Sequence, residues 1–192
     1  MKTTKADVIQ TAADIADKNG LSNLSLKVVA ESLNIRTPSL YNHIDSLESL
    51  LRDIAHNGMK TMNERMMQTA IGKIGDDAIK STGQTYLNYM IEHPGVYETI
   101  QWATCHRTEE TGKLFDDYLS LLKTLAISCN FNPVNIDEIL NLLTGVLHGY
   151  TTLQLRYAFT KPDEVRTALS AALDTVLAGL HQKYDQHEKE HL

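Results

Sequence analysis

Long segments with helical spacing of apolar residues are the feature that most constrains how this chain can fold. Only four prolines and ten glycines occur in 192 residues, so few positions interrupt these segments. Within them, apolar residues recur every three to four positions, and no run alternates in the way that a half-buried strand does. The pattern predicts an all-α protein of about nine helices.

The interruptions place the ends of the predicted helices. These helices cover about residues 4–19, 25–33, from 37, 45–69, 76–92, from 93, 109–129, 135–157 and 162–184. Thr37 is expected to cap the third helix. Asp45 with Glu48, and Asn135 with Glu138, have the spacing of capping boxes at the starts of the fourth and eighth helices. Three short helices thus precede one linking helix and five longer ones.

This order predicts a small helix-turn-helix head at residues 1–50 and a helical-bundle body at residues 51–192. The apolar content of 42% is enough for a buried core. No run of 18 apolar residues and no apolar signal region at the N-terminus are present. Two cysteines exclude a disulfide scaffold. We therefore expect a cytoplasmic protein.

Residues 25–43 have the pattern of two short helices joined by a tight turn. Ala30 is small enough for the two helices to touch, and Asn34 tolerates the positive φ that such a turn needs. Ile35 and Leu40 are expected to fill the core between the helices. Helical proteins of other kinds contain similar pairs, so the spacing alone leaves a DNA-binding role and a purely structural role both open.

The second helix of this pair carries side chains that suit a DNA major groove. Its first turn holds short hydrogen-bonding groups and one arginine, which match the donors and acceptors of base edges. Tyr41 and His43, with Lys27 from the preceding helix, are expected to reach phosphate oxygens. The candidate DNA-binding residues are Lys27, Arg36, Thr37, Ser39, Tyr41, Asn42 and His43.

The first 55 residues or so also resemble a known family. The matching segments are residues 8–13, 19–21, 29–35, 39–44 and 48–51. They are similar to the N-terminal domain of TetR-type (tetracycline-repressor-like) transcriptional regulators, and Leu40-Tyr41-Asn42-His43 is the most specific part. The resemblance implies that the helix from residue 37 reads the major groove and that the start of the next helix touches the DNA backbone.

Two positions depart from the pattern of that family. Leu47 stands where a phosphate-binding lysine is common, and Asn34 stands where the turn often has glycine. Lys27 keeps a basic residue at its site. Loss of one lysine removes one phosphate contact, which we expect to weaken DNA binding and make its salt dependence shallower.

The charge distribution excludes binding by bulk electrostatics. The chain carries a net charge of −6, and residues 1–56 hold 6 basic and 7 acidic residues. DNA binding would therefore depend on the placement of Lys27, Arg36 and the N-terminal lysines, together with backbone amides at helix starts. A dimer would double these contacts, and a palindromic operator would follow.

The last two predicted helices carry long apolar stripes. The stripes are formed by Ile136, Ile139, Leu140, Leu143, Val146, Leu147, Tyr150 and Leu153, and by Val165, Leu169, Leu173, Val176, Leu177 and Leu180. Gly145 and Gly149 share one face and would let another helix approach closely. Two such helices from each of two chains would form a four-helix dimer interface. The alternative is that the stripes pack inside one chain.

The body also resembles a C-terminal type within the same family, through residues 92–97, 147–153 with Phe159, and 177–180. Thr144 and Gln154 depart from that type, which often has tryptophan and glutamate at these positions. The resemblance implies a pocket for an inducer. Apolar walls with a few polar tips suit such a pocket, and the candidates are Tyr86, Met90, Tyr97, Trp102, Tyr118, Leu122, His148 and Thr152. Each has an alternative role in the core.

No cofactor, metal or catalytic motif stands out. The chain lacks a glycine-rich phosphate loop, a Cys-x-x-Cys pair and a zinc-protease motif, and no nucleophile–base pair rises above chance. We expect a homodimeric transcription factor that represses from a palindromic operator and is released by a small-molecule effector. The alternative is a helical small-molecule-binding or protein-interaction module that has lost DNA binding.

Overall fold

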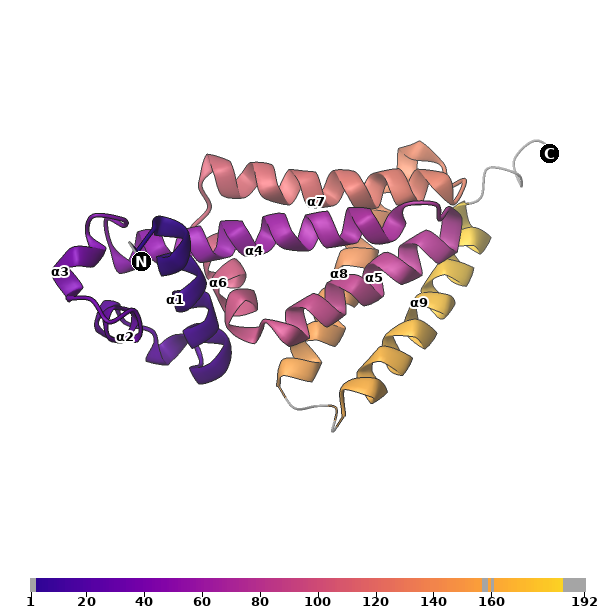
Figure 1. Cartoon of the computed structure of the whole chain (residues 1–192). Coiled ribbons are helices and arrows are strands. Elements are labelled where there is room, and N and C mark those ends of the chain that lie inside the picture. The colour runs from indigo at the N-terminus through magenta and orange to yellow at the C-terminus, as the bar shows by residue number, and fades with distance from the viewer. Residues whose placement is uncertain (1–2, 157–158, 160, 185–192) are drawn as a thin grey trace. The chain divides into compact units, whose positions relative to one another are not determined.

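A computed structural model describes residues 3–156, 159 and 161–184 of the chain (Figure 1). Across these residues the chain forms nine α-helices and no β-strand, which confirms the all-α prediction. The helices are α1 (Lys5–Asn19), α2 (Leu26–Ser32), α3 (Thr37–Leu40), α4 (Leu47–Ala70), α5 (Gly75–Glu92), α6 (Pro94–Cys105), α7 (Glu109–Ser128), α8 (Ile136–Leu155) and α9 (Pro162–Tyr184). Two 3₁₀ turns, Leu21–Asn23 and Pro133–Asn135, lie between them.

The helices group into two compact units. Unit 1 consists of residues 1–61 and 92–115, and unit 2 of residues 62–91 and 116–192. Unit 1 therefore holds α6 and the start of α7 in addition to α1, α2 and α3, while α4 contributes residues to both units. The predicted functional boundary between residues 50 and 51 stays a prediction, because these are units of packing.

Two of the predicted helix starts use other residues than the sequence suggested. Arg36, and not Thr37, occupies the cap position of α3, and its side chain makes no capping bond. At α4 the reciprocal bonds run between Ser46 and Ser49: the Ser49 amide donates to the Ser46 hydroxyl at 3.0 Å, and the Ser46 amide donates to the Ser49 hydroxyl at 3.0 Å. The serine pair replaces the predicted box of Asp45 and Glu48.

The start of α8 also differs from its prediction. Asn135 stands at the cap position but makes no side-chain capping bond, so the predicted box with Glu138 does not form. The side chain of Asn132 instead accepts a bond from the Val134 amide, and this bond opens the 3₁₀ turn that precedes the helix. Glu138 lies next to Lys183, with 3.2 Å between its Oε1 and the lysine Nζ.

The tightest helix contact of unit 1 joins α1 to α6. A Cβ added to Gly95 would lie 2.1 Å from the carbonyl carbon of Ala16, so only glycine allows this approach. Asp17 holds the same junction: its carboxylate accepts the Val96 amide at 2.9 Å and contacts His93 Nδ1 at 2.8 Å. The carboxylate thus satisfies an amide at the start of α6, where the positive end of the helix dipole favours an anion.

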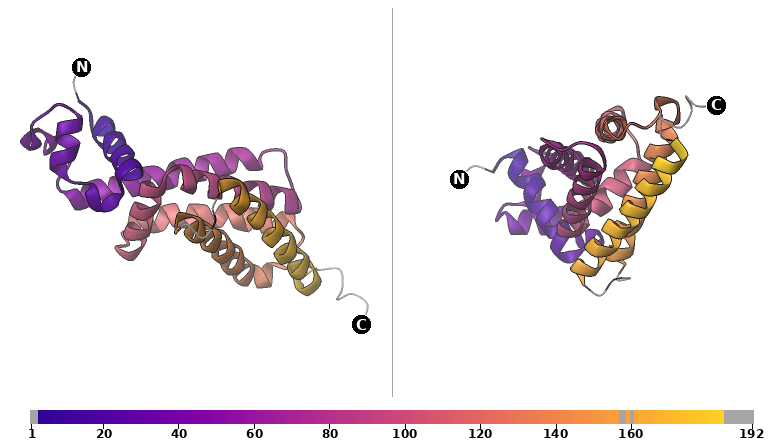
Figure 2. Two further views of the ribbon diagram at one scale, coloured as in Figure 1. Left: turned by 90° about the horizontal axis from the view of Figure 1, so that it is seen from below. Right: turned by 90° about the vertical axis from the view of Figure 1, so that its right-hand side faces the viewer.

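Unit 2 is held by apolar contacts among α5, α8 and α9. A Cβ on Gly83 of α5 would lie 3.0 Å from Leu147 of α8 and 3.1 Å from Leu173 of α9. Helices α8 and α9 run side by side in both views of Figure 2. Most residues of the two predicted stripes are buried within this unit: Ile136, Ile139, Leu140, Leu143, Leu147, Val165, Leu169, Leu173, Leu177 and Leu180. The alternative of packing inside one chain is therefore realised for these residues.

The length and polarity of the helices also bear on membranes. Throughout the described part of the chain, every helix is either too short or too polar to cross a bilayer.

Candidate DNA-binding and effector sites

The predicted helix-turn-helix forms in unit 1. Asn34 adopts a φ of 54°, in the left-handed region that the turn requires. Ala30 is buried where α2 meets α3, and its carbonyl accepts the amide of Ile35 at 3.0 Å. Leu40 is fully buried and holds α3 to the core, whereas Ile35 is half-buried. The prediction for the turn is confirmed at Ala30, Asn34 and Leu40.

Predicted residues on α3 and at its two ends lie toward solvent. The side chains divide by exposure: Arg36, Tyr41 and Asn42 are exposed, and Thr37, Ser39 and His43 are half-exposed. Tyr41 keeps 57% of its surface accessible, which is high for an aromatic residue next to the buried Leu40. These polar side chains therefore do not belong to the buried core of unit 1. Its contact with DNA stays a prediction.

Several basic residues of unit 1 are paired with acids. Lys27 lies 3.9 Å from Glu31 on the same helix, so one predicted phosphate contact has a weak intrahelical partner. Lys5 Nζ lies 2.9 Å from an Asp53 carboxylate oxygen. Arg52 bonds Glu48 at 3.1 Å. Arg36 has no ion pair within the described residues.

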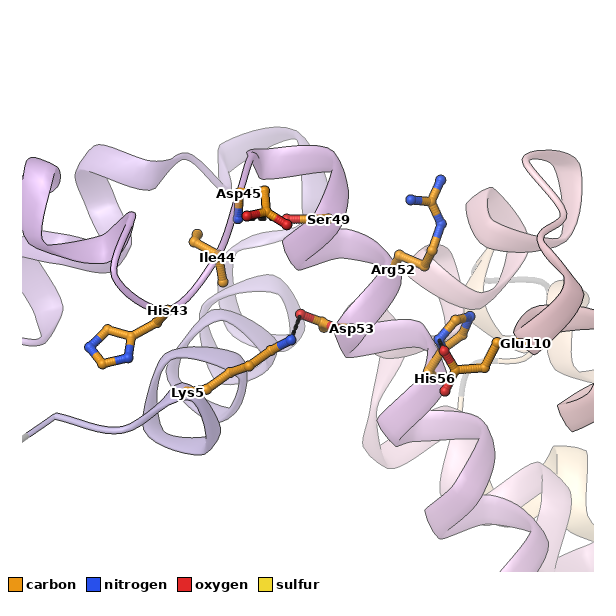
Figure 3. A pocket seen from close by; sticks show the side chains of 9 residues that line it. All are labelled: Lys5, His43, Ile44, Asp45, Ser49, Arg52, Asp53, His56 and Glu110. Carbon is orange, nitrogen blue, oxygen red and sulfur yellow. Dashed lines mark hydrogen bonds and ion pairs between the residues drawn. The ribbon is translucent and has the colours of Figure 1, made fainter.

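A pocket of about 150 Å³ opens beside the end of α3 and was not predicted from the sequence (Figure 3). Its lining residues come from α1, the segment before α4, the first turns of α4 and the start of α7: Lys5, His43, Ile44, Asp45, Ser49, Arg52, Asp53, His56 and Glu110. The lining contains both acids and bases. The Lys5–Asp53 ion pair lies on its wall.

His56 links α4 to the start of α7 and was not singled out from the sequence. It is 6% exposed, and its Nε2 lies 2.8 Å from the Thr111 hydroxyl. Its Nδ1 lies 3.4 Å from Glu110, which also faces Lys60. Burial lowers the pKa of His56 below its ordinary value, against the opposing effect of Glu110. Neutral His56 therefore suits this contact.

In unit 2 the structure brings together three of the predicted effector residues. Tyr86 Oη lies 3.2 Å from His148 Nδ1, and the rings of Tyr86 and Tyr118 are 6.0 Å apart. Burial raises the pKa of Tyr118 to about 12 and lowers the pKa of His148. Tyr118 is thus a neutral phenol and His148 a neutral imidazole at physiological pH. These three residues, from α5, α7 and α8, form the tyrosine–histidine cluster.

Further effector candidates lie in both units. Met90 and Leu122 are buried in unit 2, and Thr152 is half-buried there. Tyr97 and Trp102 belong to unit 1, where the Trp102 ring stacks on His106 at 4.6 Å between centroids. The contact of each with an effector stays a prediction.

Thr82 is a further buried polar residue near this cluster in the sequence. It is fully buried, and its hydroxyl has no hydrogen-bond partner among the described residues. Thr82 precedes Tyr86 by one helical turn on α5, so the spacing of the two was available as a signal. An unsatisfied buried hydroxyl is unusual and marks a place where a ligand or water can donate.

Unlike the buried stripes, one face of α8 and α9 has no neighbour among the described residues. In that part of the chain, no other element lies within 4 Å of a Cβ added to Gly145, Gly149 or Gly179. Leu142 and Leu153 flank the glycines of α8 and remain 44% and 47% exposed. We call these five residues the glycine face. Apolar and small residues on an open helix face allow close approach by another helix.

The described residues contain no cluster of histidine, cysteine and carboxylate side chains that could hold a metal ion. Cys105 is exposed, Cys129 is buried, and no disulfide joins them in the described structure. The candidate binding sites are the polar side chains in and around α3 and the tyrosine–histidine cluster.

Comparisons with known proteins agree with this architecture. Residues 79–176 match the family model for the tetracyclin repressor-like C-terminal domain. An uncharacterised HTH-type transcriptional regulator of Bacillus subtilis strain 168, YobS, is 29% identical over 178 residues, which span 92% of each chain.

Solved structures share the fold. A protein of unknown function from Rhodococcus sp. RHA1 superimposes with a TM-score of 0.81 at 16% identity, covering 94% of this chain and 96% of that one. A TetR variant of Acinetobacter baumannii AYE, solved in complex with minocycline, gives a TM-score of 0.70 at 19% identity, covering 96% of this chain and all of that one.

Proposed function

Because the chain belongs to the TetR family of transcriptional regulators, we propose that it binds a palindromic operator as a homodimer, represses transcription and is released by a small-molecule effector. The polar, solvent-facing surface of α3 on a helix-turn-helix carries the proposal for DNA. The glycine face of α8 and α9 supports the dimer, and the tyrosine–histidine cluster supports the effector.

The DNA contact requires few charges. Arg36 lies at the N-terminal end of α3 without an ion pair in the described structure, so its guanidinium is available for a bidentate contact with a guanine edge. Ser39 on α3 and Asn42, two residues beyond its end, offer shorter hydrogen-bonding groups. Each good base contact discriminates by about 1–3 kcal/mol, so a handful of side chains is enough for specificity without a basic surface.

The dimer contact is proposed at the glycine face. Glycines four residues apart at 145 and 149 remove side chains along one stripe of α8, and Gly179 does the same on α9. Two helices from each of two chains would then pack as a four-helix interface. A two-fold dimer presents two α3 helices, which matches two half-sites of a palindrome.

The effector is proposed to bind at the tyrosine–histidine cluster. Its neutral phenol and imidazole groups orient a ligand by hydrogen bonds, while Met90 and Leu122 offer apolar surface. The TetR variant of Acinetobacter baumannii was solved with minocycline, which supports a small-molecule ligand for this chain without naming it.

Release follows from a shift between conformations. The effector must prefer the state in which the two heads do not match the operator half-sites. Helix α4 has residues in both units, and α6 is fixed to α1 through Asp17 and Gly95. We propose α4 and α6 as the elements that couple the two sites.

The test is the binding of Arg36→Ala to DNA upstream of the gene for this protein, measured by fluorescence anisotropy. Operator affinity should fall at least tenfold, while dimerisation and thermal stability remain. Lys123→Ala, which removes a charge from an exposed site on α7 in unit 2, is the matched control and should bind nearly as the parent does. Equal affinity of the two variants would refute the role of Arg36.

A helical small-molecule-binding module with weak DNA binding is the second candidate. The observations that favour it are Leu47 in place of a lysine and the pairing of Lys5 and Lys27 with acids. No salt-dependent binding to upstream DNA, combined with stabilisation by a small molecule, would select this candidate.

A further inference from the structure

The Lys5–Asp53 ion pair lies at the edge of the proposed DNA-binding surface. Lys5 is in the first turn of α1, Asp53 is in the second turn of α4, and their charged atoms are 2.9 Å apart. Figure 3 shows the pair on the wall of the pocket that His43, three residues beyond the end of α3, also lines. The position of Lys5 therefore suits a phosphate of DNA that is read by α3.

The burial of the two partners is unequal. The side chain of Asp53 is 27% exposed and that of Lys5 is 55% exposed, so the carboxylate is fixed in the wall of the pocket while the lysine retains access to solvent. A flexible lysine next to a fixed carboxylate can exchange one anionic partner for another. A phosphate must therefore compete with Asp53 for Lys5.

The strength of the pair decides which DNA can compete. An ion pair this exposed contributes at most about a fivefold factor to an equilibrium. This is small beside the contacts of an operator, which α3 adds to the phosphate contacts. It matters more for DNA of arbitrary sequence, because electrostatics supplies essentially all of that affinity.

We infer that Asp53 is a specificity-determining residue that holds Lys5 away from non-specific DNA, an inference that rests on the proposed operator binding. Lys5 is released to a phosphate only when base contacts fix the head in register. The carboxylate therefore lowers non-specific affinity more than operator affinity. The acidic residues among residues 1–56 then contribute to the discrimination between operator and non-specific DNA, and Asp53 is the residue that does so.

The experiment measures a labelled mixed-sequence duplex by fluorescence anisotropy over a series of NaCl concentrations, using the full chain. Asp53→Asn should tighten binding about fivefold at low salt and steepen the plot of log affinity against log salt by about 0.9, the value for one added phosphate contact. Asp14→Asn removes an exposed carboxylate of the same unit, on α1, and is the matched control. Its effect should be smaller, with an unchanged slope.

The pairing itself is tested by adding Lys5→Ala. The double variant with Asp53→Asn should lose the gain, because the released cation is gone. Equal effects of Asp53→Asn and Asp14→Asn, or a gain that survives in the Lys5→Ala background, would overturn the inference. Thermal denaturation checks folding, and if Asp53→Asn does not fold, Lys5→Ala must weaken non-specific binding less than twofold. Absence of DNA binding by the parent protein at low salt would instead refute the proposed function.

Discussion

The two units fix their helices by different means. In unit 1, polar groups at low exposure join the helices: Asp17 bonds the start of α6, and His56 bonds Thr111 of α7. In unit 2, apolar stripes of α8 and α9 pack with α5, and the polar links between α5 and α9 are part-buried or exposed: Gln84 donates to the Arg166 carbonyl, Arg166 donates to Asn88, and Lys80 donates to Asp174. Directional bonds specify one geometry, whereas apolar contacts tolerate rearrangement. Unit 1 therefore differs from unit 2 in the buried bond between His56 and Thr111, whereas the α5–α9 links of unit 2 are part-buried or exposed.

Gly95 of unit 1 lies against backbone, whereas Gly145 of unit 2 has no other described element close to it. Replacement of Gly95 gives the largest expected effect. Gly95→Ala places a Cβ against the backbone of Ala16 and should cost about 3 kcal/mol of unfolding free energy, since backbone cannot yield as a side chain does. Thr124→Ala on the exposed surface of α7 is the control and should change the unfolding free energy by no more than about 0.7 kcal/mol, the range of helix propensities. Urea unfolding of both variants measures the contrast. A mild loss at Gly95 would contradict the close approach of α1 and α6.

The open glycines of unit 2 predict a defect in assembly without a defect in folding. Gly149→Leu should weaken dimerisation at least tenfold, or about 1.4 kcal/mol, because a bulky side chain would separate the helices of the proposed interface. Sedimentation equilibrium measures the effect. Thr124→Leu on the exposed surface of α7 is the control. Dimers of unchanged strength for Gly149→Leu would place the interface elsewhere.

The polar junction of unit 1 predicts a smaller loss of stability. Asp17→Ala removes the acceptor for the Val96 amide and the partner of His93, and should cost about 1 kcal/mol, as the loss of a helix cap does. Asp14→Ala, one turn earlier on α1, removes an exposed carboxylate that accepts only from Gln10 in the bonds described. It should change stability by less than half as much in the same urea titration.

Lowering the pH should reduce the stability of unit 1 through protonation of His56. This is the smallest of the effects expected here. The pKa of His56 is lowered on folding by burial, so the unfolded chain binds a proton more readily. Its contribution to stability is complete above about pH 6.5, the ordinary histidine value, and is lost as the pH falls below it. Urea unfolding at pH 7.5 and 5.5 should show a smaller pH dependence for His56→Gln than for the parent. Equal pH dependence would contradict the assignment to His56.

Several features of this protein followed from the sequence alone. Helical periodicity specified the all-α class and about nine helices, because apolar spacing is a local property of the chain. Residues Ala30, Asn34 and Leu40 specified the turn before α3, since a positive φ and a close helix contact restrict the residue types. The exposure of the polar residues in and around α3 was also predictable, because burial of polar groups is costly while the neighbouring Leu40 fills the core.

Tertiary structure decided the rest. Which serine or carboxylate caps a helix depends on the path of the preceding chain, so Ser46 and Ser49 replaced Asp45 and Glu48 at α4. The stripes of α8 and α9 looked like one interface, but packing buried most of their leucines inside unit 2 and left the glycine face open. The pairing of Lys5 with Asp53 joins residues 48 positions apart. Spacing along a chain carries no record of such contacts, because they arise only when distant helices meet.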